Sequence, residues 1–324
     1  MRNATLLLLF AGVVSARHAA ASPAFSARTM ARPEGVRHYL VDLPTHLPDE
    51  KRPTVILLHG HGSRAAHIIG MTSFAGYKMD GWARVADREG LMLIAPDGME
   101  GSDGKRAWND CRADADTNAQ SDDVAFISAL IDTAVKDLHA DPERIYVYGS
   151  SNGGGMALRL GTEIAPRLAA IGAQSATFAA TSRCKAPTHP VSVFITHGTK
   201  DKIVPYQGGA IGHWLLRGRG TGLSVDTTIA MWRALDKLPE TAQVYRFPHL
   251  NRDDDTTATR YLWGASPSGL QVELLKIDGG GHTDSSTRNE APLFLRMLVG
   301  DFNRDLDTAE EAWTFFKDKR ASGR

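Results

Sequence analysis

The chain has few cysteines, no net charge and few long apolar runs, and each absence excludes a class of protein. It has 2 cysteines in 324 residues, too few for a small fold held together by disulfides. Its 37 basic and 37 acidic residues give a formal net charge of zero. No overall field would therefore attract it to nucleic acid or to a membrane, and we expect neither as a partner. With 42% hydrophobic and 23% charged residues, the composition is that of a globular protein.

The N-terminus has the layout of a secretory signal peptide. A basic start at Arg2 precedes an apolar run over residues 4–16, which is shorter than the roughly 20 residues needed to span a bilayer. Small residues at 19–21 then precede Ser22, so we expect residues 1–21 to be removed by cleavage after Ala21. The alternative is an uncleaved anchor or a disordered N-terminus. The pattern predicts a secreted or periplasmic protein with a flexible segment over residues 22–35.

The two cysteines, Cys111 and Cys184, form an even pair, which in an oxidising compartment predicts a disulfide. Spacing alone does not pair them, so two buried, reduced thiols are the alternative. A bond between them would tether the segment after Trp108 to the segment before an expected strand at residues 191–196.

Apolar, β-branched runs alternate with stretches of helical period. In residues 122–139, for example, Val124, Ile127 and Ile131 fall on one helix face. Continuous apolar runs are typical of strands that are buried on both faces. The alternation predicts an α/β fold in one domain over residues 36–320, with a mostly parallel central sheet and helices on both faces. The expected strands cover residues 36–43, 54–59, 91–95, 144–148, 168–172, 191–196 and 270–277, and the expected helices cover residues 81–89, 122–139, 152–160, 224–238 and 308–319.

Residues 149–153, Gly-Ser-Ser-Asn-Gly, match the G-x-S-x-G pattern of a serine nucleophile. The pattern follows an expected strand and opens an expected helix, which is the context in which it forms a sharp turn that exposes the central serine. The N-terminus of that helix favours negative charge developing nearby. We therefore predict Ser151 as the nucleophile of an α/β-hydrolase fold.

A serine nucleophile needs a base, and the base needs an orienting carboxylate. In α/β-hydrolases the three follow the chain order Ser, acid, His. Asp201 comes just past the expected strand at residues 191–196, where the sites of such sheets lie, and His282 follows three glycines after the strand at residues 270–277. Taken singly, Asp201 would be a turn residue and His282 an exposed loop histidine. Order and placement together predict the catalytic triad Ser151–Asp201–His282.

Two backbone N–H groups are expected to hold the oxyanion. One comes from the loop after the strand at residues 54–59 and is assigned to His61, and the other comes from Asn152, the residue after the nucleophile. Because main-chain groups have this role, neither side chain is required. The alternative makes His59, His61 and His67 zinc ligands, but no acidic partner accompanies them at metal spacing. We expect no metal and no cofactor.

Further motifs accompany the triad. They are Leu58-His59-Gly60, Ala-Pro-Asp-Gly at 95–98, Trp108-Asn109, Asp-Asp-Val at 122–124, His-Gly-Thr at 197–199, Val204-Pro205-Tyr206 and a closing aromatic segment at 311–316. With them, residues 36–320 resemble the polyhydroxybutyrate depolymerase and feruloyl esterase group of the α/β-hydrolase superfamily. The resemblance implies an exported esterase with this triad and no cofactor. Trp108, Asn109 and Tyr206, from these motifs, are candidates for lining the substrate site.

The chain departs from the group where Asp284 follows the His-Thr pair in place of the group's Trp-Pro-Gly. Lys200 and Lys202 flank Asp201 and are further candidates for lining the site. With Arg106 and Arg112, they would form a basic rim suited to an anionic substrate. Ordinary surface lysines are the alternative.

These observations predict a serine hydrolase that cleaves carboxylic esters, either of a hydroxyalkanoate oligomer or of a feruloyl or acetyl type. The substrate is expected to be soluble and oligomeric or polymeric. One alternative is an amide hydrolase that acts on a soluble polyanion such as poly(aspartic acid), or a peptidase. A more remote alternative is a non-catalytic binding protein on the same fold.

Overall fold

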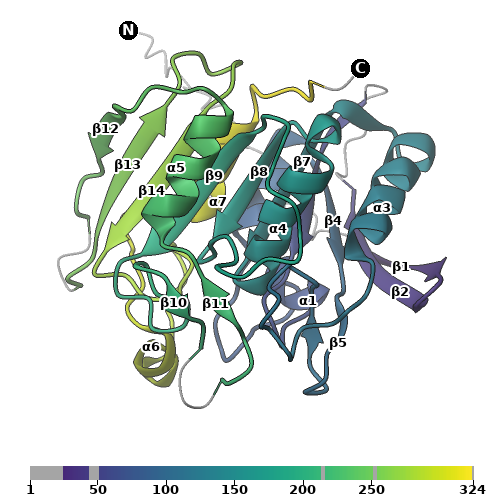
Figure 1. Cartoon of the computed structure of the whole chain (residues 1–324), viewed down its shortest axis with the longest axis horizontal. Coiled ribbons are helices and arrows are strands. Elements are labelled where there is room, and N and C mark those ends of the chain that lie inside the picture. Colours follow the sequence, from purple (N-terminus) through teal and green to yellow (C-terminus); the bar gives the residue numbers. More distant parts are fainter. Residues whose placement is uncertain (1–24, 44–50, 213–215, 251–253, 323–324) are drawn as a thin grey trace, which may run out of the picture.

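A computed structural model describes residues 25–43, 51–212, 216–250 and 254–322, so the signal peptide expected at residues 1–21 lies outside the described part. A ten-stranded sheet runs through the molecule (Figure 1). Its central strands are parallel, and antiparallel strands extend it at both edges. In spatial order the strands are β1 (Phe25–Arg32), β2 (Gly35–Asp42), β4 (Met92–Pro96), β3 (Arg52–Leu58), β7 (Ala140–Ser150), β8 (Ala170–Gln174), β9 (Ser192–Gly198), β14 (Val272–Asp278), β13 (Thr257–Trp263) and β12 (Gln243–Arg246).

Helices cover both faces of the sheet. On one face lie α3 (Asp123–Asp137), α4 (Asn152–Glu163) and α5 (Val225–Leu235), and on the other lie α2 (Gly81–Glu89) and α7 (Thr308–Phe316). Figure 1 shows α3, α4 and α5 in front of the sheet and α7 behind it. None of the helices in the described ranges is long and apolar enough to cross a membrane. The shorter elements are α1 (Ala65–Ile68), η1 (Ala165–Arg167), α6 (Leu293–Val299), β5 (Met99–Glu100), β6 (Arg106–Ala107), β10 (Gly209–Ala210) and β11 (Thr221–Gly222).

The central strand β3 shows why two layers of helices form. Successive side chains of a strand point to opposite faces, and every residue from Val55 to Leu58 is fully buried. Val55 and Leu57 belong to the apolar cluster that includes α2 and α7, whereas Ile56 and Leu58 belong to the cluster that includes α3 and α4. This double burial confirms the predicted α/β-hydrolase fold with a mostly parallel sheet in one domain.

The expectation of a flexible segment over residues 22–35 was wrong for its described part. Residues 25–32 form β1, which pairs antiparallel with β2 along its whole length. The strand is polar and mostly exposed because it lies at the edge of the sheet, so it lacks the apolar run that marks a buried strand. Strand β12 at the opposite edge is wholly exposed and was missed for the same reason, and its neighbour β13, which is partly buried, was missed as well.

The start of α7 also differs from its sequence pattern. Thr308 and Glu311 are spaced as a capping box, which predicts Thr308 as the N-cap. In the structure the N-cap is Asp307, which makes no side-chain cap hydrogen bond, and the Thr308 hydroxyl instead accepts the Ser285 N–H at 3.0 Å. A tertiary contact with the loop after His282 therefore replaces the local cap.

A disulfide joins Cys111 to Cys184, as predicted. The segments on either side run antiparallel, because the Arg183 N–H donates to the Cys111 carbonyl at 2.9 Å and the Ala113 N–H donates to the Thr181 carbonyl at 2.8 Å. The bond thus connects the loop after β6 to the segment before β9.

We predict that reducing this disulfide lowers the thermal stability. The bond closes a loop of 73 residues, which in the chain-entropy model contributes about 4 kcal/mol, and the Tm should fall by several degrees. The check is thermal unfolding with and without a phosphine reductant. The Cys111→Ala/Cys184→Ala protein is the control and should not respond to the reductant. Two free thiols in the denatured, unreduced protein would contradict the prediction.

Candidate active site

Ser151 lies in a tight turn between β7 and α4. Its backbone has φ 55° and ψ −121°, a region that residues with a side chain rarely adopt. The Ser151 N–H donates to the Gln174 carbonyl at 2.8 Å, and the Ser151 carbonyl accepts the Gly155 N–H at 2.9 Å. The turn therefore holds the serine at the end of a central strand, where the sequence motif predicts it.

The two glycines of the motif allow close backbone contacts. A Cβ atom on Gly149 would lie 2.1 Å from the Gly153 carbonyl oxygen, and one on Gly153 would lie 2.2 Å from the Leu58 carbonyl oxygen. Both distances are shorter than any non-bonded contact allows. Only glycine lets α4 begin this close to the end of β3.

His282 and Asp201 form a hydrogen-bonded pair. The distance from His282 Nδ1 to Asp201 Oδ2 is 2.8 Å. The other carboxylate oxygen accepts the backbone N–H groups of Ile203 and Val204, each at 2.8 Å. Burial alone would raise the pKa of Asp201, but His282 and His197 outweigh it and hold that pKa below its usual range. Asp201 is therefore an ionised acceptor that fixes the orientation of the imidazole.

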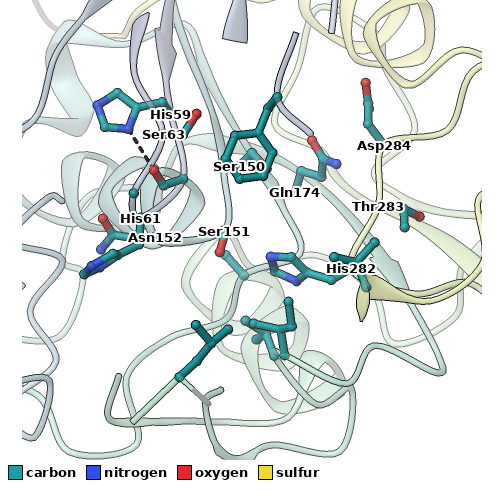
Figure 2. Close-up of a pocket in the computed structure, with 18 of the residues that line it drawn as sticks. His59, His61, Ser63, Ser150, Ser151, Asn152, Gln174, His282, Thr283 and Asp284 are labelled. Carbon is teal, nitrogen blue, oxygen red and sulfur yellow. Dashed lines mark hydrogen bonds between the residues drawn. The ribbon is translucent and has the colours of Figure 1, made fainter. Parts of the chain in front are cut away.

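The three sequence-predicted groups come together in this arrangement. Figure 2 shows Ser151 beside the imidazole ring of His282, and both residues line the same cavity. The loop that carries His282 is held by the His282 N–H, which donates to the Val299 carbonyl at 2.6 Å. Glycine at position 281 lets this loop pass close to the end of α6, because a Cβ there would lie 2.1 Å from the Val299 carbonyl oxygen. The close approach of the two backbones, rather than a bend in the loop, explains why position 281 is a glycine.

His61 and Asn152 are the residues whose N–H groups are predicted to hold the oxyanion. Both residues line the same cavity as Ser151, and among the described residues neither N–H has an acceptor. The side chain of Asn152 was not expected to be required, but it makes three hydrogen bonds. It accepts the Trp108 N–H at 2.7 Å and donates to the Trp108 carbonyl at 3.0 Å and to Asp110 at 2.7 Å. It therefore anchors the loop after β6.

His59 is a buried structural histidine. Its Nδ1 lies 2.8 Å from the Gly60 carbonyl and its Nε2 accepts the Gly98 N–H at 3.0 Å, which fixes a neutral tautomer. Burial lowers the pKa of His59 to about 4. With both ring nitrogens engaged, His59 has no free ligand atom for a metal, so the zinc alternative is not supported at this residue.

Ser151 and His282 border a cavity of about 630 Å³ that has an apolar part and a polar part. Three residues of α6 belong to the apolar part, whereas the outer residues Leu293, Phe294 and Met297 are 71%, 54% and 72% exposed. The apolar part is lined by Ile68, Phe74, Tyr77, Met79, Leu295, Leu298, Val299 and Phe302, and the polar part by His61, Lys105, Asp110, Arg112 and Arg219.

The candidates Trp108, Asn109 and Tyr206 do not line this cavity. Trp108 is fully buried, and its indole N–H donates to the His59 carbonyl at 2.9 Å. Asn109 donates its backbone N–H to a carboxylate of α3 at 2.8 Å. Tyr206 is buried and its hydroxyl donates to Asp226 at 2.9 Å. These residues support the loops around the site instead of contacting a ligand, so that expectation was wrong.

The predicted basic rim is also not assembled. Lys200 and Lys202 are exposed and stand outside the described lining of the cavity, as does Arg106. Arg112 does line it but is paired with the Asp110 carboxylate. The two lysines are surface residues, which is the alternative that the sequence left open.

Sequence reasoning missed most of the cavity lining. The apolar run of α6 was a signal, because residues 293–299 carry six apolar side chains around one arginine. Lys105 and Arg219 lie in loops without a regular pattern, so no sequence feature predicts that they share a cavity with Ser151.

Asp284 lines the cavity and has a raised side-chain pKa. Burial raises the pKa of Asp284 to about 7, and the nearby Asp307 carboxylate adds to the rise. Its backbone carbonyl accepts the Tyr77 hydroxyl at 3.1 Å. Figure 2 shows its carboxyl group pointing away from Ser151 and His282, which gives it no direct part in the triad.

Comparison with known proteins relates the chain to ester hydrolases. The model of a family described as phospholipase/carboxylesterase matches residues 46–221. A putative esterase, NocK, of Nocardia uniformis subsp. tsuyamanensis is 28% identical over 277 residues, which cover 82% of this chain and 74% of that protein. Feruloyl esterase B of Piromyces equi is 28% identical over 62% of this chain, and the poly(3-hydroxybutyrate) depolymerase of Ralstonia pickettii is 28% identical over 74% of it. The matched parts are only 35% and 45% of those two proteins.

Solved structures agree on the fold. A thermostable esterase superposes with a TM-score of 0.56 at 15% identity, covering 91% of this chain and 63% of the other. At this identity the likeness concerns the fold alone. The named relatives agree with the predicted resemblance to depolymerases and feruloyl esterases.

We predict that Asp201→Asn lowers kcat by about 10⁴-fold with little loss of stability, as the same change does in another serine triad. An amide in place of the carboxylate would favour the wrong imidazole tautomer at His282. Turnover of a chromogenic ester checks this, with the unfolding midpoint measured in parallel. A loss below tenfold would show that Asp201 is not the orienting group.

A second prediction concerns Asp284 and pH. Its pKa is raised on folding from 3.8 to about 7, so the folded state binds more protons and stability falls as pH rises through that window. Asp284→Asn should therefore raise the Tm relative to the parent at pH 8 and change it much less at pH 5. Thermal unfolding at both pH values is the measurement. Asp278→Asn, which removes a surface carboxylate paired with Lys276, is the control, and equal effects of Asp284→Asn at both pH values would refute the prediction.

Proposed function

The chain belongs to the phospholipase/carboxylesterase family, and on that premise we propose that it hydrolyses carboxylic esters through the triad Ser151–His282–Asp201. The observation that carries the proposal is the placement of the His282 ring. One nitrogen bonds the buried Asp201 carboxylate at 2.8 Å, and the ring lies beside Ser151 on its strained turn (Figure 2). This is the arrangement that activates a serine hydroxyl.

The reaction would proceed through an acyl-enzyme. The Ser151 oxygen attacks the ester carbonyl while His282 accepts the hydroxyl proton, and the N–H groups of His61 and Asn152 hold the oxyanion. His282 then gives that proton to the departing alcohol oxygen. Water attacks the acyl group on Ser151 by the same steps, which releases the acid and restores the hydroxyl.

The substrate we propose is an oligomeric hydroxyalkanoate ester or a feruloyl or acetyl ester. The apolar part of the cavity supports an acyl or alcohol group with little charge. The named relatives, a feruloyl esterase and a poly(3-hydroxybutyrate) depolymerase, support the same substrate classes. The exposed positions of Lys200 and Lys202 give no support to a polyanion that would need a basic rim.

We also propose that the protein is exported. The basic, apolar and small-residue order of residues 1–21 supports this, although these residues lie outside the described part of the chain. The Cys111–Cys184 bond supports an oxidising compartment, because disulfides are rare in reducing ones.

The test of the proposed reaction is a pair of serine variants. Ser151→Ala should lower turnover of a short-chain ester by up to about 10⁶-fold and abolish labelling by a fluorophosphonate, while folding is retained. The neighbouring Ser150→Ala protein is the matched control and should keep most activity and labelling. Equal losses in both variants would contradict the assignment of Ser151. Full activity of Ser151→Ala would also overturn that assignment, whereas a parent protein with neither turnover nor labelling would favour the remote alternative of a site that binds without catalysis.

A further inference from the structure

Arg219 is a buried cation in the wall of the cavity. The residue is 8% exposed, lines the same cavity as Ser151 and His282, and comes from the loop between β10 and β11. Its Nη1 nitrogen is buried and has no hydrogen-bond partner within the described residues. A buried, charged N–H group without an acceptor is costly, so the arrangement needs a reason.

The position of Arg219 is fixed by its neighbours. Its Nη2 donates to Asp103 at 3.2 Å. Its carbonyl accepts a hydrogen bond from Arg112 at 2.7 Å, and Arg112 is held in turn by the Asp110 carboxylate. The network continues to the active site, because Asp110 also accepts the side-chain N–H of Asn152 at 2.7 Å. The guanidinium is therefore held at a set place relative to the proposed oxyanion hole.

The polar part of the cavity has more positive than negative charge. Lys105, Arg112 and Arg219 are the cations of this part and Asp110 is its carboxylate, while Asp103 contacts Arg219 from outside the described lining. Asp110 is occupied by Arg112, and Asp103 is shared between Arg219 and His61, whose Nε2 lies 3.1 Å away. Burial lowers the pKa of the Arg219 guanidinium, Asp103 raises it in part and Arg112 lowers it again, so the pKa stays below its usual range.

We propose that Arg219, with Lys105, forms a subsite for a single substrate carboxylate, so that the preferred substrates are esters that also carry a free acid group. This inference rests on the proposed function of the Ser151 site. A guanidinium binds a carboxylate through two parallel N–H···O bonds, and such charge-assisted bonds are strong when water is excluded. The apolar part of the same cavity limits the substrate to one such charge, because it offers no partner for a second.

A cationic subsite beside an apolar surface would favour some of the proposed esters over others. A short hydroxyalkanoate oligomer has an uncharged ester backbone and one terminal carboxylate, which matches one cation beside an apolar surface. A polyanion such as poly(aspartic acid) carries a charge on every unit and would place several against α6, where desolvation is unfavourable.

The experiment compares matched pairs of esters. In the first pair, 4-acetoxybenzoate and its methyl ester differ only by a carboxylate on the leaving phenol. In the second, the mono-(4-nitrophenyl) ester of glutaric acid and its methyl ester differ by a carboxylate on the acyl group. The measured quantity is the ratio of kcat/KM for the acid to kcat/KM for the methyl ester. We expect Arg219→Gln to lower this ratio by about 10- to 100-fold for one pair, mainly through KM.

The control is Arg217→Gln, which removes an exposed arginine two positions away and should leave the ratio unchanged. Arg219→Lys, which keeps the charge but loses the planar fork, should retain part of the preference. A purely structural role for Arg219 would change both members of a pair alike. If Arg219→Gln fails to fold, Lys105→Gln decides the matter, because that variant should lower the ratio in the same direction.

An unchanged ratio for both pairs in a folded Arg219→Gln protein, or in Lys105→Gln where it is needed, would overturn the subsite. If the parent protein hydrolyses none of the four esters, the proposed function fails separately. Calorimetric titration of the Ser151→Ala protein with 4-acetoxybenzoate and its methyl ester then tests the subsite alone. Tighter binding of the acid supports it, and equal or weaker binding of the acid overturns it.

Discussion

The rest of the site depends on the close backbone contact between the serine turn and β3. Because Gly153 lies against the Leu58 carbonyl, α4 begins directly beside the end of β3, and the loop that carries His61 starts within reach of Ser151. Gly60 continues this contact, since a Cβ there would lie 3.3 Å from the Ser151 Cβ. The contact brings the proposed nucleophile close to the two N–H groups proposed to hold the oxyanion, before any loop contributes a side chain.

Hydrogen bonds and the disulfide join loops from distant parts of the chain to the Ser151 turn. Asn152 holds the Trp108 backbone, the loop continues to Cys111, and the disulfide attaches it to the segment before β9. Strand β9 in turn leads to Asp201. A rigid sheet with cross-linked loops is how a site built on irregular segments keeps its geometry.

What the sequence could predict follows from what is local in the chain. The sequence shows the order of Ser151, Asp201 and His282 and shows that each follows a strand. Because the C-terminal ends of parallel strands lie at one edge of the sheet, this was enough to predict that the three residues lie near one another. Which way a loop side chain faces was not readable, so Trp108 was expected at the ligand surface but lies in the core. Arg219 was missed because its cavity contact depends on tertiary bonds of the loop between β10 and β11. Thr308 was expected to cap α7, but its hydroxyl accepts the Ser285 N–H instead, which is a tertiary contact that the local sequence does not predict.

The exposed face of α6 gives surface adsorption a direct connection to catalysis. Leu293, Phe294 and Met297 present an apolar area to solvent, and Leu298, which is 50% exposed, belongs both to that area and to the lining of the cavity. Apolar areas of this kind favour contact with amphiphiles and with hydrophobic surfaces. Any body that covers α6 therefore also alters the edge of the cavity. Where covering α6 changes the affinity of the cavity for a ligand, thermodynamic linkage requires that the ligand change the affinity of α6 for the covering body by the same factor.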